Sequence, residues 1–575
     1  MPKISIGGGQ NLNKCGESKH ESKPKLESKP KPEFKHFLAY FIALAKNHKF
    51  LCVFVVFYCV FLIAFSRYAP NFDDLWLWLK IIEGDSKEVY MSFRPQVGRF
   101  YPLAFLDLLA LMKISTSPYL FFGFNALLFA LFCAIYIKIL DLSNGKSALN
   151  SLTLTFLALS SGFVIVFFGI CYAEKIQVIW IALFMLCSFC VIRDLSQDSQ
   201  DLRKDSRESS KIAQIIGILS LNIALFYKEP SFIAAFAFGV VLLISALCNR
   251  QKDLAKYALC VIFSALYFAL LYYVLIFDEI DKTYSALTAK HILEILQEYA
   301  LNDSLIVFCV GGMLLYRIYA VFVKKTRIEP FFDGLLVASF AYFGAFIALK
   351  MSAPYYLLPC YVLIIPSLIY FTRKYRRILF VKICLILGLF GFFTQNLPSG
   401  IYKAIDLKAR GIQFHRTLDF VASYLRTNQN VNIYFAGISR GRDIYDFETE
   451  MRPFWFADYL EKLHNAKNFD LRTNAPNGAN FHADKKSRFT LANSDIISAP
   501  KSGDLIIVSN KSIFGNSAQK AQENGELLFK SGFSSVPYIA LKPLAQYIST
   551  KYFGANLTRT NFFKLPLETY IFKAY

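Results

Sequence analysis

Apolar runs long enough to cross a membrane, separated by short polar loops, are the feature that most constrains the fold of this chain. A helix needs about 20 apolar residues to cross the roughly 30 Å hydrocarbon core of a bilayer. Of the 575 residues, 55% are hydrophobic and only 18% are charged, against about a quarter charged in soluble domains. The pattern predicts a polytopic α-helical membrane protein with about eleven spans. The predicted spans are 50–67, 119–140, 151–171, 176–193, 212–227, 231–248, 257–277, 304–323, 331–349, 355–372 and 378–395.

Lysine and arginine recur in every second loop, which predicts the orientation of the chain. Loops such as "NRQKDLAK", "KKTR" and "RKYRR" are basic, and basic loops stay in the cytoplasm. The N-terminus is therefore predicted to be cytoplasmic, with everything after about residue 396 outside. This sidedness accounts for the net charge of +21 without a nucleic-acid partner. The short run 101–114 is predicted to be a helix in the outer interface.

The sequence divides into three predicted regions. Residues 1–35 contain "KHESKPKLESKPKPEFK", which cannot bury a core and predicts a disordered, basic cytoplasmic tail. Residues 36–395 form the membrane domain. Residues 396–575 alternate strand-like runs such as "DLIIVSN" with helical runs such as "RPFWFADYLEKL", which predicts a C-terminal extracytoplasmic α/β domain. Its excess of basic over acidic residues suits anionic headgroups or an acidic glycan. In it, "FAGISRGRD" is predicted to be an ordinary turn, with a phosphate-binding turn as the alternative.

Charged and aromatic residues gather at the predicted outer ends of spans that lie far apart in sequence. Ionisable groups at membrane depth are costly and tend to mark function. The first outer loop supplies acids, tryptophans and arginine, and later loops supply acid–base neighbours and tyrosines. The residues are Asp73, Asp74, Trp76, Trp78, Arg99, Glu174, Lys175, Lys228, Glu229, Lys350, Tyr355 and Tyr356.

These residue types suit the transfer of a sugar from a polyprenyl phosphate. A carboxylate, Asp73 or Asp74, would take a proton from the incoming hydroxyl. Cations would stabilise the departing phosphate as its charge grows, with Arg99, Lys175 and Lys228 as candidates. Trp76 and Trp78 would offer ring faces to the sugar.

Each of these features also has a structural interpretation. Asp73 could cap the helix "DDLWLWLKII" with Asp74 in its first turn, and the tryptophans could be interface anchors. Lys228 and Glu229 could be a neutralising ion pair at a tight turn, and Glu174 with Lys175 simple loop charge. Their coincidence at one membrane face favours a functional site.

The order of these features resembles the GT-C superfamily, whose members are multi-span glycosyltransferases that use polyprenyl-phosphate sugars. An acidic pair follows the first span, "GR" follows about 25 residues later, "KEP" lies between later spans and "YYLLP" opens a late one. The resemblance covers roughly residues 50–395, and it is nearest to bacterial O-antigen-modifying glucosyltransferases, with some likeness to protein mannosyltransferases. It implies a GT-C-like helical membrane domain with a soluble outer domain, in the cell inner membrane.

The resemblance also implies roles for individual residues. Asp73 or Asp74 would be the catalytic acidic residue of the first outer loop, and Glu174 a second acidic position. Arg99 would contact the donor phosphate, and Lys228 with Glu229 would match a Lys-Glu motif. The late motif lacks the arginine that many members have before tyrosine, and Lys350 could replace it only as a point charge. Some members need Mg²⁺ or Mn²⁺ and others do not, so a divalent metal stays open.

The predicted function is an inverting membrane glycosyltransferase that acts on a glycan, lipid or protein acceptor. Two alternatives are a polymerase or ligase of lipid-linked glycans and a flippase or transporter. Transporters gather charge near the bilayer midplane, whereas the charges here lie at the outer ends of the spans. Membrane lipid and a polyprenyl-phosphate-linked sugar are the predicted partners.

Overall fold

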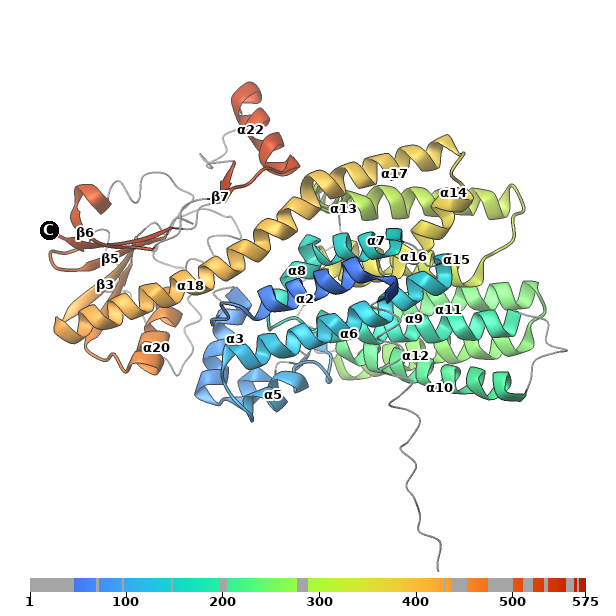
Figure 1. Cartoon of the computed structure of the whole chain (residues 1–575), viewed down its shortest axis with the longest axis horizontal. Helices are drawn as coiled ribbons and strands as arrows, with labels where there is room; N and C mark the ends of the chain where they lie inside the picture. Colours follow the sequence, from blue (N-terminus) through green and yellow to red (C-terminus); the bar gives the residue numbers. More distant parts are fainter. Residues whose placement is uncertain are drawn as a thin grey trace, which may run out of the picture. The chain divides into compact units, whose positions relative to one another are not determined.

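Helices dominate the fold, which is described by a computed structural model and drawn in Figure 1. Within the residues described, nine helical segments are long and apolar enough to cross a membrane, and one bent helix pair adds a tenth. A polytopic helical membrane protein is thereby confirmed. The structure describes residues 46–68, 72–90, 92–95, 98–145, 148–196, 204–276, 288–428, 430–436, 452–473, 500–509, 521–531, 536–554, 563–565 and 568–575.

The nine segments follow the predicted apolar runs closely. Some combine an α-helix with a short π- or 3₁₀-helical stretch, labelled η. They are α6 (Pro118–Asn144), α9 (Glu174–Ser196), α10 (Lys204–Tyr227), α11 (Ser231–Cys248), α12 (Lys252–Ile276), η3 (Leu305–Val310) with α14 (Gly311–Phe322), α15 (Pro330–Ala348), η4 (Pro354–Leu357) with α16 (Leu358–Lys374), and α17 (Leu379–Gly391) with η5 (Phe392–Asn396) and α18 (Leu397–Thr427).

The first predicted span, 50–67, is the shorter helix α2 (Lys49–Ile63) of 15 residues. At 1.5 Å per residue it is about 22 Å long, less than the roughly 30 Å of hydrocarbon. Together with the nine segments and the bent pair, it accounts for the predicted number of about eleven.

The predicted span 151–171 is broken in two. It consists of α7 (Ala148–Ala158) and α8 (Ser161–Phe168), which meet at an angle of 63°. A break frees backbone groups that need partners inside a membrane. The buried Asn396 accepts a hydrogen bond from the Ser161 N–H at 3.0 Å, and the break also lies against α18, where a Cβ on Gly400 would collide with the Leu159 carbonyl oxygen.

At the C-terminal end of α8, a buried asparagine again forms hydrogen bonds with the free backbone groups. The side-chain amide of Asn125, on α6, donates to the carbonyl oxygens of Phe167 at 3.0 Å and Gly169 at 2.9 Å. Asn396 donates in turn to Asp303 and to Tyr361 on α16. Two buried asparagines therefore satisfy the broken helix from distant parts of the chain.

The segment after the first span folds into short elements. They are α3 (Phe72–Glu83), α4 (Ser86–Val89), the antiparallel pair β1 (Phe93–Arg94) and β2 (Arg99–Phe100), and α5 (Leu106–Met112). The last falls in the run 101–114 predicted to be interfacial. With seven residues it rises only about 10 Å, too little to span a bilayer.

The last described span runs without interruption into the C-terminal region. The helical segment Leu379–Thr427 has 49 residues, or about 73 Å at 1.5 Å per residue. Residue 396, the predicted start of the outer domain, lies inside this helical run, so the polypeptide passes between the two regions as helix rather than as a loop.

The C-terminal region is α/β, as predicted. Its five-stranded sheet has the order β4-β3-β5-β9-β6, with β3 parallel to β4 and β5, and β9 antiparallel to its neighbours. The strand-like run "DLIIVSN" singled out in the sequence contains β5, which pairs directly with β3. The elements are β3 (Val431–Ala436), α20 (Arg452–His464), β4 (Phe469–Thr473), β5 (Leu505–Ser509), β6 (Gly525–Lys530), β7 (Val536–Pro537), α22 (Leu541–Phe553), β8 (Lys564–Leu565) and β9 (Thr569–Ala574).

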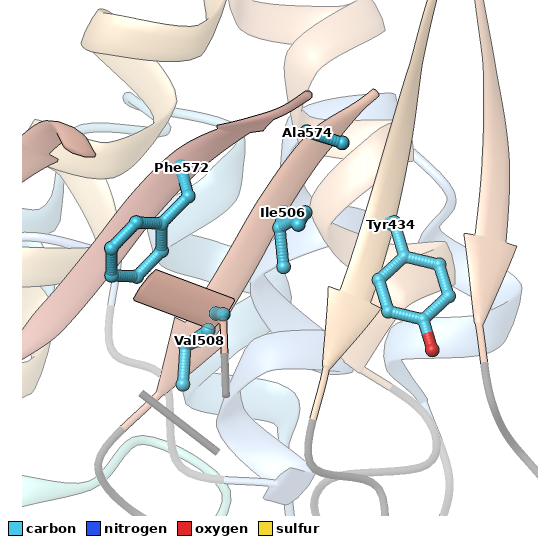
Figure 2. Close-up of a cluster of buried hydrophobic side chains, with 6 residues drawn as sticks. Tyr434, Ile506, Val508, Phe572 and Ala574 are labelled. Carbon is cyan, nitrogen blue, oxygen red and sulfur yellow. The ribbon is translucent and has the colours of Figure 1, made fainter. Parts of the chain in front are cut away.

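One face of this sheet carries a buried apolar cluster that includes Tyr434, Ile506 and Phe572 (Figure 2). Helix α20, which contains the predicted helical run "RPFWFADYLEKL", contacts the membrane region. The fully buried Tyr459 donates its hydroxyl to the Leu75 carbonyl oxygen of α3 at 2.7 Å. The run "FAGISRGRD" continues past β3 into 437–443, outside the described residues.

Replacing Asn396 should destabilise the fold. Asn396→Ala would leave the buried Ser161 N–H unpaired, at about 1–3 kcal/mol, and would leave the Asp303 carboxyl with the Tyr361 hydroxyl as its remaining donor. The unfolding temperature of the detergent-solubilised protein measures the loss. Thr394→Ala is the matched control, because Thr394 bonds only to the Phe390 carbonyl oxygen of its own helical run. Equal unfolding temperatures for the two variants would contradict this account of the broken helix.

Candidate active site

The loop between α8 and α9 is held by Asp74 and Lys175. Asp74, on α3, is fully buried, and its Oδ1 accepts hydrogen bonds from the N–H groups of Ile170 at 3.0 Å and Cys171 at 2.9 Å. Lys175, in the first turn of α9, donates to the Ile170 carbonyl oxygen at 3.0 Å. Both side chains therefore position the loop that leads into Glu174.

Burial and nearby polar groups act on the pKa of Asp74 in opposite directions. Burial raises the pKa of this carboxyl, although its hydrogen bonds to the loop and the nearby charge of Lys175 oppose the rise. Its second oxygen, Oδ2, is buried and has no hydrogen-bond partner. Asp74 thus acts on the site through the loop, and its carboxylate is shielded from water.

An ion pair joins two helix ends next to this loop. Glu174 begins α9, and its Oε1 lies 3.0 Å from the Nζ of Lys228, in the turn between α10 and α11. The geometry is that of a charge pair rather than a hydrogen bond. Burial alone would lower the pKa of Lys228, but the charges of Glu174 and Glu229 outweigh it, so the pKa is raised. Lys228 is therefore a cation at any physiological pH.

Glu229 and Arg99 extend this cluster. The Oε1 of Glu229, which is 7% exposed, accepts a hydrogen bond from the Phe100 N–H at 2.9 Å, which ties β2 to the α10–α11 turn. Arg99 precedes Phe100 in β2, and its charge opposes the rise in the pKa of Lys228. Two cations and two acids therefore lie near one another in this cluster.

Tyrosines surround the Lys228 ammonium group. Its Nζ lies 5.7 Å from the ring centroid of Tyr101 and 5.5 Å from that of Tyr356. The Tyr356 ring is 4.2 Å from Tyr355, which is 4.9 Å from Tyr172 in the α8–α9 loop. This chain of rings connects the loop held by Asp74 with the ion pair.

The structure brings together most, but not all, of the residues proposed from the sequence. Glu174, Lys228, Glu229 and Arg99 form one electrostatic cluster, and Tyr355 lies beside it through Tyr356. Lys175 is 2% exposed and donates to the Ile170 carbonyl oxygen of the loop, and its proposed contact with a phosphate stays a prediction. Tyr101 was not proposed, and only its place two residues after Arg99 in "GRFYPL" could have indicated it.

The other proposed residues are Trp76, Lys350 and Asp73. Trp76 is half-buried. Lys350 follows α15 with a left-handed φ of 55°. The side chain of Asp73, which falls within α3, lies outside what the structure describes. These three assignments stay predictions.

Trp78 is a core residue, which corrects its assignment as a sugar platform. It is fully buried and packs edge-on against Phe121 at 4.8 Å and Tyr68 at 5.3 Å between ring centroids. Residues at different positions of α3 face different parts of the protein, and Trp78 faces α6, which carries Phe121. No ring face is left for a ligand.

Among the residues that the structure describes, no group of three or more histidine, cysteine, aspartate or glutamate side chains could hold a metal ion. The described side chains of the cluster are cations that lie near acids.

Comparison with known proteins gives alignments to solved structures at low identity. No family model matches the sequence, and no curated protein matches it significantly. The oligosaccharyltransferase of Archaeoglobus fulgidus, tethered to an acceptor peptide, aligns at 11% identity and a TM-score of 0.39 over 71% of this chain, which spans 63% of the length of that protein. Its apo form aligns at 12% identity and a TM-score of 0.39, over 74% of this chain and 64% of that chain.

ArnT from Cupriavidus metallidurans, in the apo state, aligns over 94% of this chain and 98% of its own, at 9% identity and a TM-score of 0.38. At these TM-scores the alignments assign no role to any residue.

The two substitutions Asp74→Asn and Asp74→Ala should differ in stability. An asparagine oxygen can still accept both loop N–H bonds, whereas alanine leaves two buried donors unpaired at about 1–3 kcal/mol each. Unfolding temperatures at pH 7 should therefore fall clearly for Asp74→Ala and little for Asp74→Asn.

The pH dependence of this comparison has a definite sign. Because the folded pKa of Asp74 is raised, its contribution is fully present below the unfolded pKa of about 4 and is lost as pH rises through the folded pKa. The stability of Asp74→Asn relative to wild type should therefore increase from pH 4 to pH 7. A relative stability that falls over this range would show that the carboxylate is the favoured form.

Proposed function

We propose that this chain is an inverting membrane glycosyltransferase. It would move a sugar from a polyprenyl-phosphate donor to a glycan, lipid or protein acceptor at the outer face of the cell inner membrane. The observation that carries the proposal is the cluster of Lys228 and Arg99 with Glu174 and Glu229, assembled from helix ends far apart in sequence. Solvent-shielded charges of this kind are costly and mark function.

The cations suit the leaving group of this reaction. A polyprenyl phosphate bonded to a sugar carries one negative charge, and it gains a second as the glycosidic bond breaks. Lys228 and Arg99 would bind this growing charge more strongly in the transition state than in the ground state, which is the condition for catalysis. Tyr101 and Tyr356, beside the Lys228 ammonium, would donate hydroxyl hydrogen bonds to the same phosphate.

The acceptor requires a base, which we assign to Asp73. Its neighbour Asp74 already accepts two backbone hydrogen bonds and is fully buried, so Asp74 positions the loop before Glu174. Asp73 would take the proton of the acceptor hydroxyl as the oxygen attacks the anomeric carbon from the side opposite the phosphate. A single displacement of this kind inverts the configuration.

A polymerase or ligase of lipid-linked glycans would use the same donor chemistry with a larger acceptor. A flippase would move the lipid without cleaving it. The decisive measurement is the release of polyprenyl phosphate from a polyprenyl-phosphate sugar by the purified protein. Transport of intact donor without release would contradict the proposal.

Substitution of Asp73 should abolish most of the activity, and substitution of Asp74 should not. Loss of a general base lowers the rate by about 10²–10⁴-fold, so Asp73→Asn should lower kcat by this factor. Asp74→Asn keeps the loop bonds and serves as the matched control. A large loss of kcat in Asp74→Asn, with Asp73→Asn near wild type, would exchange the two assignments.

Glu174→Gln should shift the alkaline limb of the pH–rate profile to lower pH. Glu174 is a principal cause of the raised pKa of Lys228, so removing its charge lowers that pKa. The ammonium form needed for phosphate binding would then be lost at lower pH than in the wild type. Lys228→Arg, which keeps its charge to high pH, should restore the alkaline limb in the double variant. An unchanged limb in Glu174→Gln would show that Lys228 does not carry the alkaline transition.

A further inference from the structure

Helix α22 of the C-terminal region is amphipathic in an unusual sense, because its apolar face is turned outward. Leu541, Leu544, Ile548 and Tyr552 are separated by three, four and four residues, a spacing that places them on one helix face. Leu544 is 44% exposed, Ile548 39% and Tyr552 67%. We call these four residues the α22 stripe.

The opposite face of α22 packs on the rest of the protein. Pro543 is buried, the Gln546 Oε1 is inaccessible to water, and the Tyr547 ring lies 5.4 Å from that of Phe563. A helix of a water-soluble domain turns its apolar face inward. In α22 the inward face includes proline, glutamine and tyrosine, so the outward stripe has a purpose other than core packing.

The position of α22 relative to the membrane spans is set by bonds at its start. The Lys542 N–H donates to the Gln395 Oε1 at 2.7 Å, and the Lys542 Nζ lies 3.8 Å from the Glu298 Oε1. Gln395 is at the end of the apolar part of Leu379–Thr427, and Glu298 precedes the span that begins at Leu305. Both contacts therefore lie where two spans leave the hydrocarbon.

A second contact supports this placement. Just before α22, the Tyr538 and Ser399 hydroxyls are 2.9 Å apart, and the Tyr538 ring lies 5.0 Å from that of Tyr402. Ser399 is one turn beyond Gln395 on the same helix. The apolar surface of the neighbouring span, which includes Phe390 at 57% and Phe393 at 43% exposed, ends within a turn of these contacts.

We propose that α22 lies on the surface of the bilayer and inserts the α22 stripe at the boundary between headgroups and acyl chains. Interfacial helices bind through an apolar face flanked by basic residues that reach the headgroups. In α22, Lys542 and Lys551 flank the stripe on either side, and Lys551 lies over the ring of Tyr552. The ligand is therefore an anionic phospholipid surface. This inference does not depend on the proposed function.

Photocrosslinking of the full-length protein in nanodiscs tests this proposal. A benzophenone amino acid at Leu544 or Ile548 inserts into nearby C–H bonds, and mass spectrometry identifies the adducts. Position Phe390, on a membrane span, is the positive control, and position Thr550, on the opposite face of α22, is the matched negative control. We expect lipid adducts at 544 and 548, as at 390, and few at 550.

The headgroup preference is tested with nanodiscs of phosphatidylcholine alone and of phosphatidylcholine mixed with phosphatidylglycerol. A lysine near an anionic surface contributes about 1 kcal/mol, so Lys542→Gln and Lys551→Gln should each lower the preference for phosphatidylglycerol adducts about fivefold. Adducts at 544 and 548 only with protein, whether with a second copy or the same chain, would overturn the proposal, as would equal lipid labelling at 550. A preference unaffected by both lysine substitutions would overturn the anionic specificity.

Discussion

The ion pair between Glu174 and Lys228 is the interaction on which the candidate site depends. Its atoms are 3.0 Å apart, and the two side chains are 2% and 12% exposed. Removing two charges from water costs several kcal/mol for each ion, and either charge alone would be strongly destabilising. The start of α9 and the α10–α11 turn must therefore meet. Glu229 in the same turn then places β2, and with it Arg99.

The site is built by side chains that hold the backbone of other segments. Asp74 binds the α8–α9 loop from α3, Lys175 binds it from α9, and Asn125 binds the end of α8 from α6. Each bond satisfies a backbone group that would be costly to leave unpaired in a membrane protein. The same bonds fix the loop before Glu174 in advance of any ligand, which is the preorganisation that electrostatic catalysis requires.

The sequence predicted the spans well because hydrophobic length is a local property, but it did not predict how they are interrupted. The run 151–171 reads as one helix, and its break at Leu159 and Ser160 depends on Asn396, which is more than 200 residues away in the chain. The continuation of the last span through residue 396 was missed for a related reason. A polar helix outside the membrane and a polar loop have similar hydropathy.

The sequence indicated which charged residues could lie together but not the direction of individual side chains. Glu174, Lys228, Glu229 and Arg99 were grouped because all four fall in loops predicted to lie on the same side, and the structure places them in one electrostatic cluster. Neighbouring positions on a helix diverge by about 100°, so hydropathy alone could not separate Asp73 from Asp74. Trp78 was misassigned for the same reason. Its place in the helix did not reveal that its ring packs against Phe121.

The proposed chemistry follows from how the charges are already balanced. Glu174 and Glu229 offset Lys228 and Arg99, so the four side chains together are neutral. In the proposed reaction a donor phosphate with one charge would compete with Glu174 for Lys228, and it would bind weakly relative to a phosphate with two. The cluster would therefore be better matched to a departing polyprenyl phosphate than to the intact donor, and this difference would lower the barrier to breaking the glycosidic bond.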